Sequence, residues 1–201
     1  MARHLEIYTE EQSAEVFLNI LLPRLFPNIS FKIYPHQGKS DLLKKLPKKL
    51  YAARQWMTDD YRIIVLLDRD KEDCEALKLR LENLAHTAGF VTKTQNAAGF
   101  QVVNRIAIEE LEAWMLGDET AVRAAFPCVP TFIHKEEYQN PDDIINAWET
   151  LENLLQRGGY YKKGYPKKDA ARKIAANMNP EVNKSRSFHV FIEGVKACLA
   201  G

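Results

Sequence analysis

The stretch YRIIVLLDRDKEDC, residues 61–74, places an unbroken apolar run, Ile63 to Leu67, directly before Asp68-Arg69-Asp70. Such a run is typical of a strand that is buried on both faces of a parallel sheet. In open α/β sheets, ligands bind beyond the carboxyl ends of the strands. The stretch therefore predicts a buried strand with two acidic side chains at the ligand-binding edge of a sheet.

Strand and helix patterns alternate on both sides of this run. Successive strand–helix units predict an open, doubly wound, mainly parallel α/β sheet with right-handed crossovers. The expected strands are residues 5–9, 31–35, 63–67, 90–94 and 101–108. The expected helices are residues 12–26, interrupted by Pro23, 40–50, broken at Pro47, 71–88 and 109–118.

The C-terminal part of the chain shows helical patterns only, over residues 142–157, 167–178 and 187–199. We therefore expect an α/β domain over residues 1–126 and a helical, basic C-terminal subdomain over residues 127–201, packed on the sheet domain.

Composition limits the class of protein. The chain has 201 residues, of which 46% are apolar, so it can bury the core of one domain with an appendage. No apolar run approaches the roughly 18 residues that span a bilayer, and the N-terminus has no signal-peptide apolar region, so we expect a cytoplasmic protein without a membrane contact. Cys74, Cys128 and Cys198 form no C-x-x-C pair, which indicates buried free thiols rather than disulfides or a zinc site.

Asp68 and Asp70 form the candidate metal site. Two carboxylates at positions i and i+2 beside a sheet edge can share a hard cation such as Mg²⁺, or Mn²⁺ in its place, because these ions take oxygen ligands. The alternative is structural: Asp70 and Asp73 are also suitable caps for the N-terminus of the following helix.

Further acids follow two other strands of the expected sheet. Glu10 and Glu11 come after the first strand, and Glu109 and Glu112 follow the last one. The first pair is a candidate for acid–base catalysis and the second pair for binding a second metal ion. The alternative for Glu109 and Glu112 is a solvated helix face beside buried Leu111 and Met115.

Basic residues concentrate toward the C-terminus. Residues 157–190 contain nine Lys or Arg against Asp169 and Glu181, a local balance of 9 − 2 = +7. Lysines neutralise phosphates and tyrosines stack on unpaired bases, so this composition favours DNA or RNA as a partner. The alternative is a solvated lysine-rich loop. A second basic stretch covers residues 39–54. The candidate nucleic-acid-binding residues are Lys39, Lys162, Lys163, Lys167, Lys168, Arg172 and Tyr161.

Two other phosphate-handling motifs fit less well. Haloacid-dehalogenase phosphatases carry their aspartate pair after the first strand, whereas this pair follows the third. The segment QGKS, residues 37–40, has Ile33 where a P-loop requires glycine, so the phosphate cradle is missing.

Five blocks in order resemble one bacterial family, the domain of unknown function 4276. They are EIYTEEQSAEVFLNILLPRLFP, HQGKSDLLKKLPKKL, RIIVLLDRDKEDCEALKLRLE, VVNRIAIEELEAWMLGD and NKSRSFHVF. The family is similar to Toprim domains, the metal-binding α/β fold of topoisomerases, bacterial primases and OLD-family nucleases.

This resemblance implies roles for three residues: Glu10 in acid–base chemistry, and Asp68 and Asp70 in binding Mg²⁺. Many relatives have Glu-Gly where this chain has Glu10-Glu11, so the choice between the two glutamates stays open. The implied function is a Mg²⁺-dependent nuclease acting on DNA or RNA, as an effector of a bacterial defence system with an ATPase partner. The alternative is a non-catalytic module that uses the same acids to dock a partner or nucleic acid.

Overall fold

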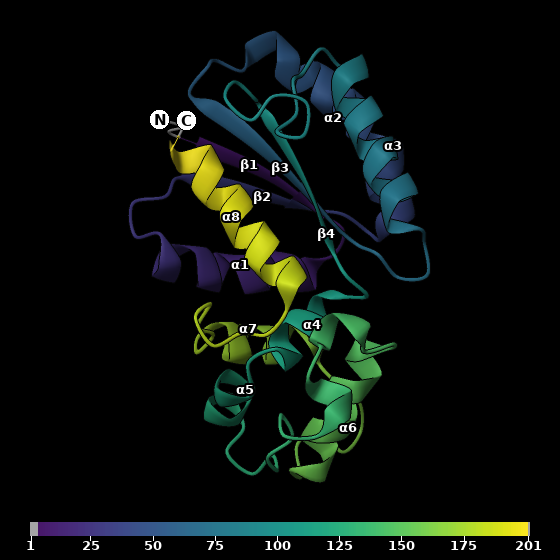
Figure 1. Ribbon diagram of the computed structural model, residues 1–201, viewed down its shortest axis with the longest axis vertical. Helices are drawn as coiled ribbons and strands as arrows, with labels where there is room; N and C mark the ends of the chain where they lie inside the picture. The colour runs from purple at the N-terminus through teal and green to yellow at the C-terminus, as the bar shows by residue number, and fades with distance from the viewer. Residues whose placement is uncertain (1–3, 201) are drawn as a thin grey trace.

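The computed structural model describes residues 4–200 and contains a four-stranded, all-parallel sheet flanked by helices (Figure 1). The strands follow the spatial order β2-β1-β3-β4. This order confirms the predicted open, doubly wound sheet. The strands are β1 (His4–Thr9), β2 (Phe31–Pro35), β3 (Tyr61–Asp68) and β4 (Val102–Ala107).

Helices cover both faces of this sheet, and others extend beyond its carboxyl edge (Figure 1). The helices of the sheet layers are α1 (Gln12–Leu25), α2 (Lys39–Trp56), α3 (Cys74–Thr87) and α8 (Arg186–Ala200). The remaining elements are α4 (Leu111–Leu116), α5 (Glu119–Ala125), η1 (Glu136–Tyr138), η2 (Pro141–Asp143), α6 (Ala147–Arg157) and α7 (Lys167–Ala175).

The apolar run of β3 is buried from both sides, as its sequence predicts. Ile64 and Leu66 belong to the core beneath α1 and α8. Ile63, Val65 and Leu67 belong to a second core beneath α2 and α3. Because side chains alternate along a strand, only an apolar residue at every position satisfies two cores at once. The run thus explains why β3 lies inside the sheet.

The C-terminal helices are divided between the sheet and the region beyond it. α7 packs against α1, where the Arg24 guanidinium donates a hydrogen bond of 2.6 Å to the carbonyl of Ala175. α8 then returns to pack on β4 (Figure 1). The domain division after residue 126 stays a prediction.

Both helices with an internal proline continue through it, contrary to the expected breaks. Pro47 lies on the exposed side of α2, and Leu46 and Leu50 on either side of it are fully buried. A proline inside a helix costs about 3 kcal/mol. Burial of several leucines offsets this, at roughly 1.5–3 kcal/mol for each side chain. Pro23 lies in the last turn of α1.

The expected strand at residues 90–94 is wrong. Only an isolated bridge joins Thr92 to Val102, and the chain turns at Thr92, whose carbonyl accepts hydrogen bonds from the amides of Gln95 and Asn96. The Thr92 hydroxyl instead bonds to the buried carboxylate of Glu82 on α3. Tertiary hydrogen bonding therefore overrides the β-propensity of this segment.

The three cysteines differ in exposure, although all were expected to be buried. Cys198 is buried as expected, but Cys128 is exposed and Cys74 is half-buried; all three are free thiols. Within residues 4–200, no helix is both long enough and apolar enough to cross a membrane.

Candidate functional site

The register of the sheet brings the ends of three strands together. Thr9 of β1 pairs with Leu66 of β3, and Asp68 pairs with Ala107 of β4. Glu10 follows β1 immediately, and its carboxylate accepts a hydrogen bond of 3.3 Å from the backbone amide of Asp68. The expected convergence of acids at the carboxyl edge of the sheet is therefore present for Glu10 and Asp68.

Asp68 lies in the most acidic surroundings of this edge. Burial raises the pKa of its carboxyl group well above the usual range, and the charges of Glu10 and Glu112 raise it further. Asp70 and Glu110 add to the same effect. These five residues, Glu10, Asp68, Asp70, Glu110 and Glu112, are called the acid cluster below.

Two glutamates of the acid cluster have a pKa close to neutrality. Burial, followed by the charge of Asp70, raises the pKa of Glu10 to about 7, although Lys39 opposes the shift. Burial also raises the pKa of Glu112 to about 7, supported by Glu110 and opposed by Lys167. Burial and neighbouring like charges thus both disfavour the ionised form of these two carboxyl groups.

Lys39 supplies one of the two cations beside the cluster. Its ammonium lies 2.7 Å from the carboxylate of Asp70 and 3.0 Å from that of Glu72, and it donates to the carbonyl of Arg69 at 3.0 Å. Burial disfavours its charge, but the hydrogen bonds to Asp70 and Glu72 prevail and raise its pKa. Lys39, expected to bind nucleic acid, therefore holds the loop after β3 in this structure.

Asp70 does not cap the following helix. The carboxylate of Asp73 accepts the capping hydrogen bond, at 2.7 Å, from the amide of Ala76. Asp70 has a left-handed backbone with φ of 50°, which is rare for a residue other than glycine, and its amide donates to the carbonyl of Glu109. The structural alternative thus applies to Asp73 and leaves Asp70 as a member of the acid cluster.

The acids after β4 are arranged differently from the expectation. Glu109, predicted as a metal ligand, forms an ion pair with Arg69. Its neighbour Glu110 was not predicted as a site residue. The charge of Glu110 helps to raise the pKa of Asp68, and its carboxylate accepts a hydrogen bond of 2.8 Å from the amide of Trp148. Glu112 belongs to the cluster and is almost fully buried, at 3% exposure, and its role as a metal ligand stays a prediction. The adjacent glutamates 109 and 110 were the available signal, but the sequence alone does not indicate which one acts on Asp68.

Lys167 is the second cation beside the acid cluster. Its ammonium lies 5.3 Å from the centre of the Trp148 ring. Burial disfavours the charge, but Glu112, Glu11 and other nearby carboxylates raise the pKa of Lys167. Lys167 begins α7, so the helical region contributes directly to the electrostatics of the sheet edge.

A cleft of about 700 Å³ adjoins this edge. Its lining includes Glu11, Gln12 and His36 from the sheet domain, and Tyr165, Lys167 and Lys168 from the segment that leads into α7. The Lys168 ammonium donates to the side-chain carbonyl of Gln12 across the cleft. Glu11 is thus a cleft residue, whereas Glu10 contacts Asp68.

The other predicted nucleic-acid-binding residues lie on the surface around α7. Lys162 and Lys163 are exposed, and Arg172 is 3.8 Å from Asp169. The hydroxyl of Tyr161 donates to Asp169 at 2.5 Å, and its ring packs edge-on against Phe126. Tyr161 therefore contributes to packing in this arrangement, and its stacking on bases stays a prediction.

The acid cluster provides the chemistry of a hard-cation site but not an assembled one. Its donors are carboxylate oxygens, which suit Mg²⁺ and Mn²⁺. Within residues 4–200, however, no three His, Cys, Asp or Glu side chains are positioned together to hold a metal ion. Asp70 is paired with the Lys39 ammonium, so a metal ion at Asp70 would have to displace Lys39.

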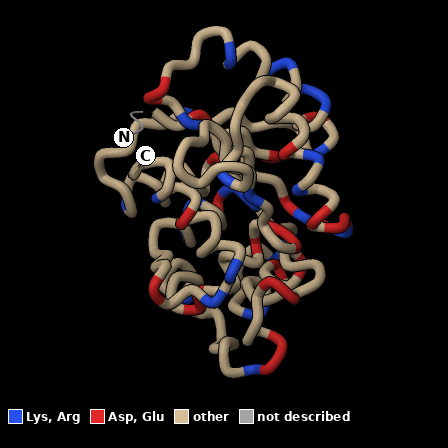
Figure 2. The backbone as a smooth tube through the Cα atoms, turned by 45° about the horizontal axis from the view of Figure 1, so that its top comes forward, with Lys and Arg blue, Asp and Glu red and all other residues tan. Residues whose placement is uncertain are grey.

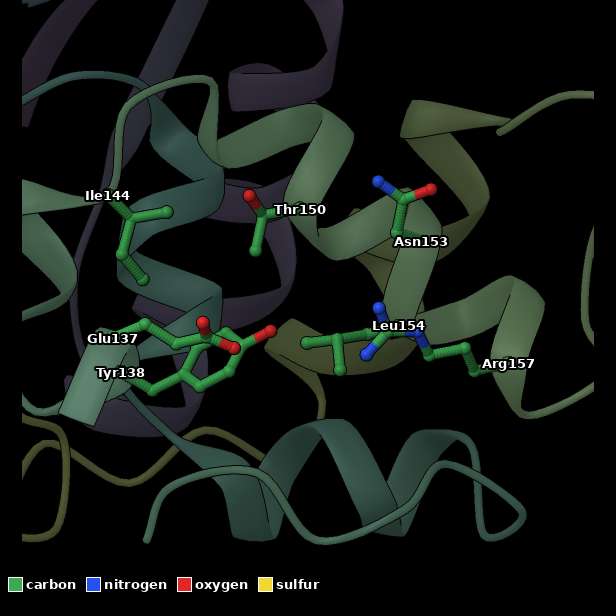
Figure 3. Close-up of a pocket in the computed structure, with 7 residues that line it drawn as sticks. All are labelled: Glu137, Tyr138, Ile144, Thr150, Asn153, Leu154 and Arg157. Carbon is green, nitrogen blue, oxygen red and sulfur yellow. The ribbon is translucent and has the colours of Figure 1, made fainter. Parts of the chain in front are cut away.

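A separate cavity of about 210 Å³ lies between η1 and α6 (Figure 3). Tyr138, Leu154 and Arg157 line it, and no residue of the acid cluster reaches it. The cavity carries none of the chemistry predicted from the sequence.

A family model matches residues 9–196, nearly the whole chain. The protein belongs to the family described as domain of unknown function DUF4276. The DUF4276 chain is also similar in structure to the C-terminal region of the Xanthomonas campestris pv. campestris OLD protein, with 15% sequence identity, a TM-score of 0.47, and coverage of 100% of this chain and 97% of that one. No curated protein matches the chain.

Proposed function

We propose that this DUF4276 protein is a Mg²⁺-dependent nuclease that cleaves phosphodiester bonds in DNA or RNA. The supporting observation is the contact between Glu10 and Asp68 across two neighbouring parallel strands, inside the acid cluster. This arrangement agrees with the roles that the Toprim resemblance of the sequence implies for Glu10, Asp68 and Asp70.

Asp68 and Asp70 would hold the cation in this proposal, with the Glu10 carboxylate beside Asp68 for proton transfer. A bound Mg²⁺ or Mn²⁺ offsets charge on the phosphoryl oxygens and lowers the pKa of an attacking water. The acid cluster explains why a divalent cation would be attracted, since its buried carboxylates are short of positive charge. Glu112 would bind a second ion or support the first, and Glu109 would do so only after leaving Arg69.

The protein's own side chains supply proton transfer and charge. A carboxyl group with a pKa of about 7, such as that of Glu10, is well matched to exchanging protons near neutral pH. Lys39, at the start of α2, and Lys167, at the start of α7, both lie beside the acid cluster. Both can stabilise negative charge that develops on a phosphate.

The cleft would bind the substrate strand beside the acids. Lys167 and Lys168 face Gln12 and Gly38 across it, so phosphates can be neutralised next to the reacting bond. Lys162, Lys163 and Arg172 extend this positive surface around α7 in the proposal.

One observation favours the alternative, a docking module without catalysis. The ion pairs of Lys39 with Asp70 and Glu72 already satisfy part of the acidic surface without a metal ion. In that case, the acids would bind basic groups of a partner. The effector role beside an ATPase partner in bacterial defence rests on the family resemblance of the sequence.

A cleavage assay with a matched control tests the proposed function. Wild type, with a candidate ATPase partner added if the chain alone is inactive, should cut plasmid, single-stranded DNA or RNA when Mg²⁺ or Mn²⁺ is present. Asp68→Asn should abolish cutting, whereas Asp73→Asn should not, because asparagine also caps helices and Asp73 lies outside the cluster. Equal activity of both variants would contradict the proposal.

A further inference from the structure

The second basic stretch of the sequence forms a positively charged face on α2. Residues 31–55 contain seven Lys or Arg against Asp41 alone, a balance of 7 − 1 = +6, in a chain whose net charge is only +1. Basic segments recur along the upper part of the backbone tube, where α2 lies (Figure 2). We call Lys32, Lys44, Lys45, Lys48 and Lys49 the α2 basic face.

Two of these lysines are held in place by aromatic rings. The ammonium of Lys49 lies 5.2 Å from the centre of the Tyr34 ring and 5.5 Å from that of Tyr8. The ammonium of Lys32 lies 5.1 Å from the Tyr34 ring. The two tyrosine rings stack on each other at 5.3 Å. Cation–π contacts of this kind position a lysine without neutralising its charge.

The remaining lysines of the face are exposed. Lys44 and Lys48 are one helical turn apart, about 6 Å along the axis, and so are Lys45 and Lys49. Lys45 pairs with Asp41 at 2.7 Å, which leaves the other four without a carboxylate ion-pair partner in the described part of the chain. β2 is an edge strand, so no further strand covers Lys32 and Tyr34.

The helix that carries most of the α2 basic face starts at the cleft beside the acid cluster. Gly38, the residue directly before α2, lines the cleft together with His36 and Gln37. The ring of His36 lies 6.3 Å from that of Tyr8, which in turn contacts Lys49. The cleft lining and the lysines of the α2 basic face are therefore attached to the same helix, the lining at its N-terminus and the lysines along its exposed side.

We propose that the α2 basic face binds the phosphodiester backbone of a nucleic-acid strand that enters the cleft. The proposal rests on the proposed function and adds the path of the substrate. Rows of ammonium groups one helical turn apart supply sequence-independent affinity for phosphates. Tyr8 and Tyr34 face each other and the lysines, so they orient cations rather than read bases.

Binding without catalysis tests this proposal. Asp68→Asn protein in EDTA would be titrated with labelled single-stranded DNA, single-stranded RNA and duplex DNA, and fluorescence anisotropy would be followed over a range of salt concentrations. In this background, the α2 variant replaces Lys44, Lys45, Lys48 and Lys49 by Gln. The matched control replaces four exposed cations outside both basic stretches, Arg80, Arg123, Lys135 and Lys196, by Gln.

The α2 variant should bind at least about tenfold more weakly at moderate salt. Its log–log salt slope for single strands should fall by roughly 3, since each phosphate contact contributes about 0.7. The control should match the parent protein. If the α2 variant loses thermal stability, the single exposed change Lys48→Glu provides the same comparison with Lys196→Glu.

The outcomes separate this proposal from the proposed function. Equal affinities and salt slopes for the α2 variant and the control overturn the proposed role of the α2 basic face, even if wild type cleaves nucleic acid. A parent protein that binds none of the three nucleic acids overturns both proposals. Weaker binding of only one nucleic acid by the α2 variant supports the proposal and identifies the form of nucleic acid that the α2 basic face binds.

Discussion

The carboxylate of Glu10 accepts a hydrogen bond of 3.3 Å from the backbone amide of Asp68, although 57 residues separate the two in sequence. The contact arises because β1 and β3 are parallel neighbours whose carboxyl ends lie side by side. It directs Glu10, and not Glu11, toward the aspartate pair. Glu11 instead lines the cleft, where its charge helps to raise the pKa of Lys167.

Glutamate-to-glutamine changes distinguish these two residues. Glu10→Gln preserves size but removes the group that can exchange a proton beside Asp68, so we expect cleavage to slow at least roughly a hundredfold. Glu11→Gln should reduce the rate only a few-fold. Initial rates at saturating Mg²⁺, with nucleic-acid affinity measured in parallel, provide the comparison. The reverse order of effects would assign the chemistry to Glu11.

Burial of the acid cluster predicts an unusual pH dependence of stability in the metal-free protein. Burial raises the pKa of Glu112 from 4.5 to about 7, so its favourable contribution is fully present below pH 4.5 and is lost as the pH rises through 7. A shift of this size corresponds to about 3 kcal/mol. Glu112→Gln should therefore gain stability relative to wild type between pH 5 and pH 8.

Urea unfolding at both pH values in EDTA measures this gain. Glu119→Gln, on α5 and outside the cluster, is the control, and its difference from wild type should not grow with pH in the same way. A stability difference between Glu112→Gln and wild type that is independent of pH would show that burial does not raise the pKa of Glu112.

Lys39 competes with any cation for Asp70. Its ammonium is 2.7 Å from the Asp70 carboxylate, so Lys39→Gln should free that ligand and tighten Mn²⁺ binding several-fold. Lys71→Gln, a nearby exposed lysine, should leave the affinity unchanged. Calorimetric titrations of the two variants with Mn²⁺ test this. Weaker Mn²⁺ binding by Lys39→Gln would mean that Lys39 supports the metal site by ordering the loop after β3 and does not compete with the ion for Asp70.

Stability of the fold should depend on the buried carboxylate of Glu82. Burial raises its pKa, but hydrogen bonds from Thr92, Asn104 and Lys78 outweigh burial and lower it. Its contribution is therefore present above the unfolded pKa and is lost as the pH falls through the folded one. Glu82→Leu leaves its polar partners buried and should cost about 1–3 kcal/mol at pH 7.

Unfolding in urea at pH 7 and pH 3 gives the measurement. The exposed glutamate Glu75 on the same helix is the reference position, where Glu75→Leu should have little effect at either pH. A Glu82→Leu protein that is as stable as wild type at pH 7 would contradict the account of this network.

The elements that could be predicted from the sequence are those specified by local patterns. The run at Ile63–Leu67 identified β3 because burial on two faces requires apolar residues at every position. Asp68 and Asp70 could be placed at the sheet edge for the same reason. Residues 90–94 could not be assigned correctly from the sequence. Their conformation depends on the hydrogen bond from Thr92 to Glu82 on α3, and no local sequence pattern indicates this contact.

The rest of the candidate site depends on tertiary contacts. Glu109 and Glu110 are equivalent in sequence, and the pairing of Arg69 with Glu109 decides which one joins the acid cluster. Similarly, Lys167 was predicted only as part of a basic run. Its position beside Glu112 follows from the packing of α7 on α1, which no spacing in the sequence reveals.

Calorimetric titration of Mn²⁺ into wild type, Asp68→Ala and Asp73→Ala tests the central claim most directly, because it requires neither a substrate nor a partner. We predict that wild type and Asp73→Ala bind the ion with similar affinity, that Asp68→Ala shows no binding, and that its metal-free thermal transition stays within a few degrees of wild type. Unchanged Mn²⁺ binding by Asp68→Ala would contradict the assignment of the acid cluster as a metal centre.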